Sequence, residues 1–150
     1  MILLSFDVEE FDGPREHGVE YSLEEGMKVS VVGTNIILDV LKANDVRATF
    51  FCTANFAENA PDVMERIIRE GHEVACHGVD HFSPKETDFE VSKEIVERVC
   101  GLTITGYRQP RMFPVLDSEI KRVGYRYNSS LNPAFIPGRY MNLDTPRTWF

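Results

Sequence analysis

Short apolar segments alternate with helix-like segments along this chain, and that order constrains its fold more than any other feature. The expected strands cover residues 2–8, 46–53, 72–76, 103–108 and 125–128. The expected helices are one capped by Thr34 and ending near Asn44, one from Pro61 to Gly71, and two over residues 88–100 and 116–123. A helix between successive strands predicts a parallel sheet, because right-handed crossovers return the chain in the same direction. The sequence therefore predicts one α/β domain over residues 1–150.

The connection after the first expected strand is longer than a simple turn needs to be. Residues 9–30 are mostly polar and contain glycine, and they separate that strand from the helix capped by Thr34. Long connections in compact domains are usually functional or disordered. We therefore expect this loop to contribute to a site.

Charge and hydropathy exclude several classes of partner. The chain carries a formal net charge of −8 and has a pI near 5.0, without the clustered Lys and Arg that nucleic acids or anionic membranes require. No apolar run approaches the roughly 20 residues that span a bilayer, and the N-terminus lacks the basic region of a signal peptide. The sequence predicts a cytoplasmic protein that binds no nucleic acid and has no membrane span.

The three cysteines are expected to be reduced and partly buried. Cys52, Cys76 and Cys100 form no C-x-x-C pair, and an odd number cannot all pair within one molecule. A thiol nucleophile would need a neighbour that lowers its pKa. His77 directly follows Cys76, but adjacent residues of an extended chain point to opposite faces. We therefore discount a Cys–His pair.

Polar side chains follow three of the expected strands. In parallel α/β folds, ligands bind where the carboxyl ends of the strands meet the following loops. Asp7 and Glu9 lie at the first such end, and an extended backbone puts both carboxylates on one face. Alone, the two acids fit an acidic loop entrance equally well.

The HGVDH segment places two imidazoles four residues apart. His77 and His81 can turn toward one cation through a helical turn or through a compact loop at Gly78. A carboxylate would complete three protein ligands and leave a position open for water, as in catalytic zinc sites. The alternative is that both histidines are solvated and bind nothing. The acids at the same edge of the sheet favour metal binding over this alternative. We expect His17 to be a loop residue and His72 a strand-entry residue.

The segment GYRQPRMF offers a residue that could position one of the acids. Pro110 restricts the residue before it to extended conformations, so the segment leaves its strand in a fixed direction. Arg108 could then reach Asp7 and orient its carboxylate. On this segment alone, a surface arginine is as good an explanation.

Together these motifs resemble those of the polysaccharide deacetylase family. SFDVEE, HGVDH, GYRQPRMF and GYRYNSSLNP occur in the family's order and at about its spacing, over residues 2–133. The resemblance implies an irregular (β/α) barrel, a divalent metal ion held by Asp-His-His, and a carbohydrate substrate whose N-acetyl groups are removed from amino sugars. Zinc is the default metal for two nitrogens and one oxygen.

By similarity, Asp7 and Arg108 are the catalytic candidates, with Asp7 as the base and Arg108 orienting it, and His77 and His81 are metal ligands. The common family motif has two adjacent aspartates, whereas Val8 follows Asp7 here. Glu9 is then the expected third ligand, with Glu10 as the substitute. The shared face of Asp7 and Glu9 independently favours Glu9.

Two departures from the family pattern keep other functions open. Family members normally supply a late histidine that protonates the leaving amine, but no histidine follows His81. The strands are also too few to close a barrel, so we expect either a piece of a longer domain or an incomplete barrel whose exposed sheet edges a partner chain covers, as in a homo-oligomer. The alternatives are a metal-independent hydrolase of small cyclic amides and a catalytically silent carbohydrate-binding module. Three aromatic residues could stack on a sugar ring: Tyr107, Phe113 and Trp149. The alternative is that they pack in the core.

Overall fold

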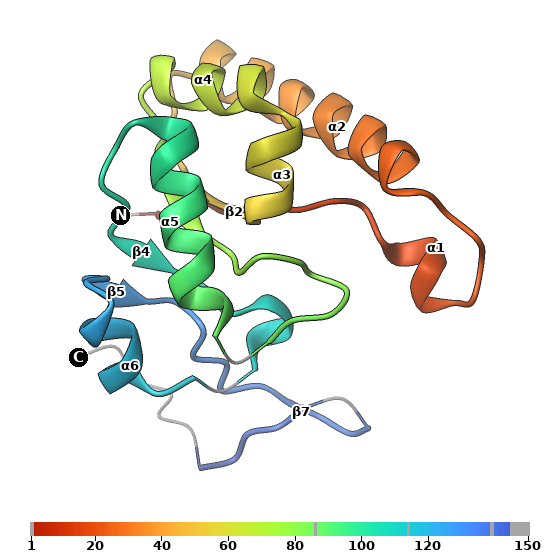
Figure 1. Cartoon of the computed structure of the whole chain (residues 1–150), viewed down its shortest axis with the longest axis vertical. Coiled ribbons are helices and arrows are strands. Elements are labelled where there is room, and N and C mark those ends of the chain that lie inside the picture. The colour runs from red at the N-terminus through yellow and green to blue at the C-terminus, as the bar shows by residue number, and fades with distance from the viewer. Residues whose placement is uncertain (1, 86, 114, 139, 145–150) are drawn as a thin grey trace.

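A single parallel sheet organises the fold (Figure 1). The computed structural model describes residues 2–85, 87–113, 115–138 and 140–144. The sheet has the order β1-β2-β3-β4-β5, and all of its pairings are parallel. Its strands are β1 (Ser5–Val8), β2 (Thr49–Cys52), β3 (Glu73–Cys76), β4 (Gly106–Tyr107) and β5 (Tyr127–Asn128). The predicted α/β class is confirmed, and the sheet does not close into a barrel within the described residues.

The expected helices are present, with one boundary wrong. The helices are α1 (Gly13–Glu16), α2 (Leu23–Ala43), α3 (Ala54–Asn59), α4 (Pro61–Arg69), α5 (Asp88–Cys100) and α6 (Asp117–Arg122). Thr34 does not cap α2 but is buried within it. The cap is Ser22, whose side chain accepts from the Glu25 N–H while the Glu25 carboxylate accepts from the Ser22 N–H. Gly26 and Gly33 interrupt the apolar stripe of α2, so the sequence pattern does not predict the first half of this helix.

The expected long loop is therefore shorter than residues 9–30. It contains α1, and its last part is the first turns of α2. Gly26 permits this arrangement, because a Cβ built there would lie 2.6 Å from the backbone oxygen of Phe11. The close contact packs the residues after β1 against the beginning of α2.

The helices cover one face of the sheet and form the core with it. α5 packs against α3 and α4, and α2 packs against α4 (Figure 1). On the sheet side, this core contains Phe50 and Cys76, both fully buried. Tyr107 has an exposed fraction of 0%, which rules it out as a stacking surface for a sugar. Strand residues that alternate with these point to the opposite face.

The opposite face of the sheet is largely polar. Tyr127 lies across Gly106, where a built Cβ would stand 2.1 Å from the tyrosine oxygen. The Tyr127 hydroxyl donates to Glu73 at 3.0 Å, and the Thr49 hydroxyl donates to the other Glu73 oxygen at 2.6 Å. A short antiparallel hairpin, β6 (Phe135–Ile136) and β7 (Tyr140–Met141), follows the sheet. Of the helices in the described part of the chain, none has the length and apolar character needed to cross a bilayer.

Candidate metal and acid–base site

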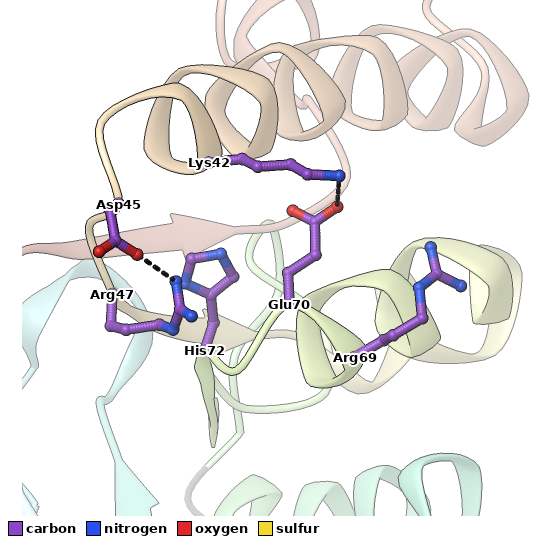
Figure 2. A pocket seen from close by; sticks show the side chains of 6 residues that line it. All are labelled: Lys42, Asp45, Arg47, Arg69, Glu70 and His72. Carbon is purple, nitrogen blue, oxygen red and sulfur yellow. Dashed lines mark ion pairs between the residues drawn. The ribbon is translucent and has the colours of Figure 1, made fainter.

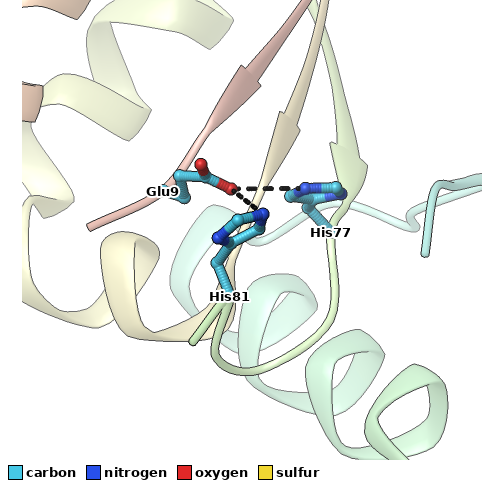
Figure 3. A group of neighbouring side chains, drawn as sticks. All are labelled: Glu9, His77 and His81. Atoms are coloured by element: carbon cyan, nitrogen blue, oxygen red, sulfur yellow. Dashed lines mark ion pairs between the residues drawn. The ribbon is translucent and has the colours of Figure 1, made fainter. Parts of the chain in front are cut away.

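Glu9, His77 and His81 converge at the carboxyl ends of β1 and β3 (Figure 3). Each of the two histidine Nε2 atoms lies 3.4 Å from Glu9 Oε2. One ligand atom from each of the three residues fits within a group whose members all lie within 4.8 Å of one another. The two residues of the HGVDH segment therefore face one carboxylate oxygen from the first strand.

In each imidazole, Nδ1, the nitrogen that points away from Glu9, is hydrogen-bonded to an acceptor. His77 Nδ1 donates to the backbone carbonyl of Arg108 at 2.9 Å, and His81 Nδ1 donates to Asp12 Oδ2 at 3.0 Å. A carbonyl or carboxylate oxygen only accepts, so Nδ1 of each ring carries a proton. Nε2 of each ring faces Glu9 and is the atom that could bind a metal, as in metal-binding histidines whose other nitrogen is fixed by an acceptor.

The donor set fits a divalent cation. Glu9 Oε2 is buried and accepts no hydrogen bond, although buried polar atoms are normally paired. Three electron-pair donors that face one another repel unless a positive charge lies between them. Ligands about 2.1 Å from a tetrahedral metal are about 3.4 Å apart, which matches both Glu9–histidine distances. The three residues could therefore hold a metal ion with a position left open.

Local backbone geometry turns the HGVDH segment back toward the sheet. Gly78 has a φ of 72°, and a Cβ built there would lie 2.8 Å from Pro110. The N–H groups of Ala54 and Asn55, at the start of α3, donate to the carbonyls of Gly78 and Val79 at 3.0 and 3.1 Å. A side chain at position 78 would therefore displace the loop that carries both histidines.

Glu10 has a structural role in this geometry. It is 3% exposed, and its carboxylate accepts from the Thr53 hydroxyl at 2.8 Å. Its other oxygen accepts from the Asn55 amide and from the His81 backbone N–H. These contacts keep Glu10 on the opposite side of the chain from Glu9 and leave Glu9 facing the histidines.

Asp7 lies on the same face as Glu9 and is paired with Arg108. The Arg108 guanidinium donates to Asp7 Oδ1 at 2.6 Å, and its other terminal nitrogen donates to the hydroxyls of Ser5 and Ser129. The guanidinium carbon also lies 4.0 Å above the Phe51 ring. These four contacts fix the direction of the arginine, which in turn fixes the Asp7 carboxylate.

A cavity of about 600 Å³ lies between the segments that follow β3 and β4 and the helices α5 and α6. Gln109, next to Arg108, lines it together with Phe113, Val115 and Leu116. Phe113 is 51% exposed and keeps its ring available for stacking. Trp149, the remaining stacking candidate, lies outside the described residues.

A second cavity, of about 350 Å³, lies at the opposite ends of the strands (Figure 2). It is lined by Lys42, Asp45, Arg47, Arg69, Glu70 and His72. His72 Nδ1 accepts from the Ala48 N–H at 3.3 Å, and burial lowers the pKa of this imidazole. His72 is therefore a neutral histidine that terminates the sheet, in agreement with its predicted position at a strand entry.

The cysteines offer no nucleophile. All three are free thiols, and Cys52 and Cys76 are buried. Burial raises the pKa of Cys76 to about 12 and that of Cys100 to about 11, so both remain protonated near neutral pH. The prediction of reduced, core-filling cysteines is confirmed.

Asp12 is the site residue that sequence reasoning missed. It is 6% exposed and precedes α1, and its carboxylate accepts from a histidine 69 positions away. The only local signal is an acid before Gly13-Pro14, which is typical of a helix start. Nothing in the spacing of Asp12 and His81 predicts their contact.

Comparisons with known proteins identify the family of the chain. The family model described as polysaccharide deacetylase matches residues 2–126. A peptidoglycan deacetylase of Helicobacter pylori is 27% identical over 118 residues, which cover 73% of this chain and 40% of that protein. A chitooligosaccharide deacetylase of Bradyrhizobium is 44% identical over 45 residues, 30% of this chain and 20% of that one.

A solved structure is similar over most of the chain. It is a putative polysaccharide deacetylase from Mycobacterium smegmatis, with a TM-score of 0.68 and 26% identity over 86% of this chain and 50% of that one. The chain thus spans half or less of the length of each of these proteins. Because the family model covers nearly all of the sheet and every residue of the site, the chain belongs to the polysaccharide deacetylase family.

Proposed function

We propose that this protein is a metal-dependent hydrolase that removes N-acetyl groups from the amino sugars of a polysaccharide or cell-envelope glycan. One observation carries the proposal: Glu9, His77 and His81 converge on one point, next to an Asp7–Arg108 pair on the same face. Family membership, and similarity to a peptidoglycan deacetylase and a chitooligosaccharide deacetylase, support the substrate class.

The metal would be held by one carboxylate oxygen and two imidazole nitrogens. This set suits zinc, and other first-row divalent ions also accept it. A divalent cation bound there supplies Lewis acidity toward water and toward an amide carbonyl. Nε2 of each histidine is left for the metal because the Arg108 carbonyl and Asp12 accept from the Nδ1 atoms.

Asp7 is the proposed general base. Its carboxylate takes a proton from the attacking water, a contribution that is typically worth about 10²- to 10⁴-fold in rate. Arg108 is the positioning residue, because it orients Asp7 through a 2.6 Å hydrogen bond. The cavity lined by Phe113 offers one sugar ring an aromatic surface.

The variant His77→Ala tests the proposal. Removing one of three ligands should abolish stoichiometric metal binding and lower the rate of acetate release from N-acetylglucosamine oligomers about 100-fold or more, since metal catalysis supplies several kcal/mol. Elemental analysis and an acetate assay measure the two effects. His17→Ala, at an exposed histidine after α1, is the control. Full activity in His77→Ala would refute the proposed site.

A second candidate function is a catalytically silent carbohydrate-binding module on the same fold, for which the cavity lined by Phe113 offers a binding surface. Calorimetric titration with chitin and peptidoglycan oligomers distinguishes the two functions. Sugar binding without acetate release under any divalent metal selects the binding module, whereas turnover with zinc excludes it.

A further inference from the structure

We propose that Asp12 is a positioning residue that sets the tautomer and direction of His81 and thereby tunes the affinity of the site for its metal. The inference rests on the proposed metal site and extends it to a residue beyond the ligands. It starts from the 3.0 Å hydrogen bond that Asp12 Oδ2 accepts from His81 Nδ1.

The contact is shielded from water. Asp12 is 6% exposed, and the His81 side chain is 16% exposed. A carboxylate in such a place strengthens its hydrogen bond, because the surroundings screen charge less than bulk water does. The negative charge also makes the opposite ring nitrogen a better electron-pair donor.

Arg111 makes further contacts that hold Asp12 and His81 in place. The Arg111 guanidinium approaches both, with Nη2 at 4.0 Å from Asp12 Oδ2 and Nε donating to the His81 carbonyl at 3.3 Å. Arg111 reaches this position from a backbone with a φ of 58°, a conformation that non-glycine residues rarely adopt. Such strain is typical of sites where geometry matters.

The loops on each side are also fastened together. Glu10 accepts from the His81 N–H at 3.3 Å, and the guanidinium of Arg15 lies 4.2 Å over the Phe82 ring. The segment after β1 therefore contacts the HGVDH loop at several points. Among them, only the Asp12 bond acts on the imidazole nitrogen opposite the one that faces Glu9.

The test compares Asp12→Ala with Asp12→Asn. The alanine variant loses both the acceptor and the charge, and we expect its zinc dissociation constant to rise 10- to 100-fold, the usual effect of removing such an outer residue. The asparagine variant keeps an oxygen acceptor and should lose less affinity. Asp62→Ala is the control, because Asp62 is an exposed acid in the first turn of another helix that begins with proline.

A second measurement needs no metal. Nitrogen-15 NMR of the metal-free protein should show His81 protonated at Nδ1 in the wild type and in Asp12→Asn, and at a mixture of both nitrogens in Asp12→Ala. Wild-type zinc affinity, or an unchanged tautomer, in a folded Asp12→Ala protein would overturn the inference. If the wild-type protein binds no zinc, the proposed function fails, while the tautomer result still decides the role of Asp12.

Discussion

Arg108 connects the two halves of the proposed site through different parts of one residue. Its guanidinium holds Asp7, and its backbone carbonyl holds His77 Nδ1. The side chain has a planar fork that meets three oxygen atoms at once and stacks on Phe51, which a lysine could not do. At the scale of residues, this arrangement supports the proposal that Asp7 takes the proton and that Glu9 binds the metal.

The variant Asp7→Asn tests this division of roles. Asparagine keeps an oxygen for Arg108 but cannot take a proton, so we expect unchanged metal content and a fall in kcat of about 10²- to 10⁴-fold. Elemental analysis and acetate release measure the two quantities, with Asp45→Asn at the opposite end of the strands as the control. Loss of metal in Asp7→Asn would instead make Asp7 a ligand.

At the scale of elements, packing at the edge of the sheet requires a glycine, Gly106, in the short strand β4. Tyr127 of β5 lies directly over Gly106 of β4, and its hydroxyl donates to Glu73 of β3. One tyrosine thus braces three neighbouring strands. Any side chain at position 106 must displace this ring.

A pair of glycine variants tests this brace. Gly106→Ala should lower the free energy of unfolding by about 1 to 3 kcal/mol, because the new methyl group overpacks the ring. Gly33→Ala, in the interior of α2 with no atom within 4 Å of the new methyl group, should raise it by about 0.5 to 1 kcal/mol. Urea denaturation measures both, and equal effects of the two variants would contradict the brace.

The elements also show what the sequence can and cannot predict. Asp88–Cys100 is predicted residue by residue, because its apolar stripe is regular and Gly101, with a φ of 65°, ends it. The start of α2 is missed because its glycines break the stripe, although the pair Ser22 and Glu25 marks it. The Asp12–His81 contact is not predictable locally, since it depends on how two distant loops meet. The roles of Asp7, Glu9, His77, His81 and Arg108 stay predictions.

At the scale of the whole molecule, the site joins segments that the chain separates widely. Glu9 follows β1, and both histidines follow β3. A ligand that binds all three stabilises only the folded chain, because the unfolded chain does not hold them together. Metal binding at the proposed site would therefore be thermodynamically linked to folding.

This linkage predicts a stabilisation that can be titrated. Zinc at 100 times its dissociation constant should raise the free energy of unfolding by about 2.7 kcal/mol, and a chelator should reverse the change. Thermal or urea unfolding with and without zinc measures it. His81→Ala should show no such gain and His17→Ala should show all of it. An equal gain in both variants would indicate binding elsewhere.

The double attachment of Arg108 has a mechanical consequence. Its guanidinium contacts Asp7 and its backbone carbonyl contacts His77, so a displacement of residue 108 would disturb the proposed base and one proposed ligand together.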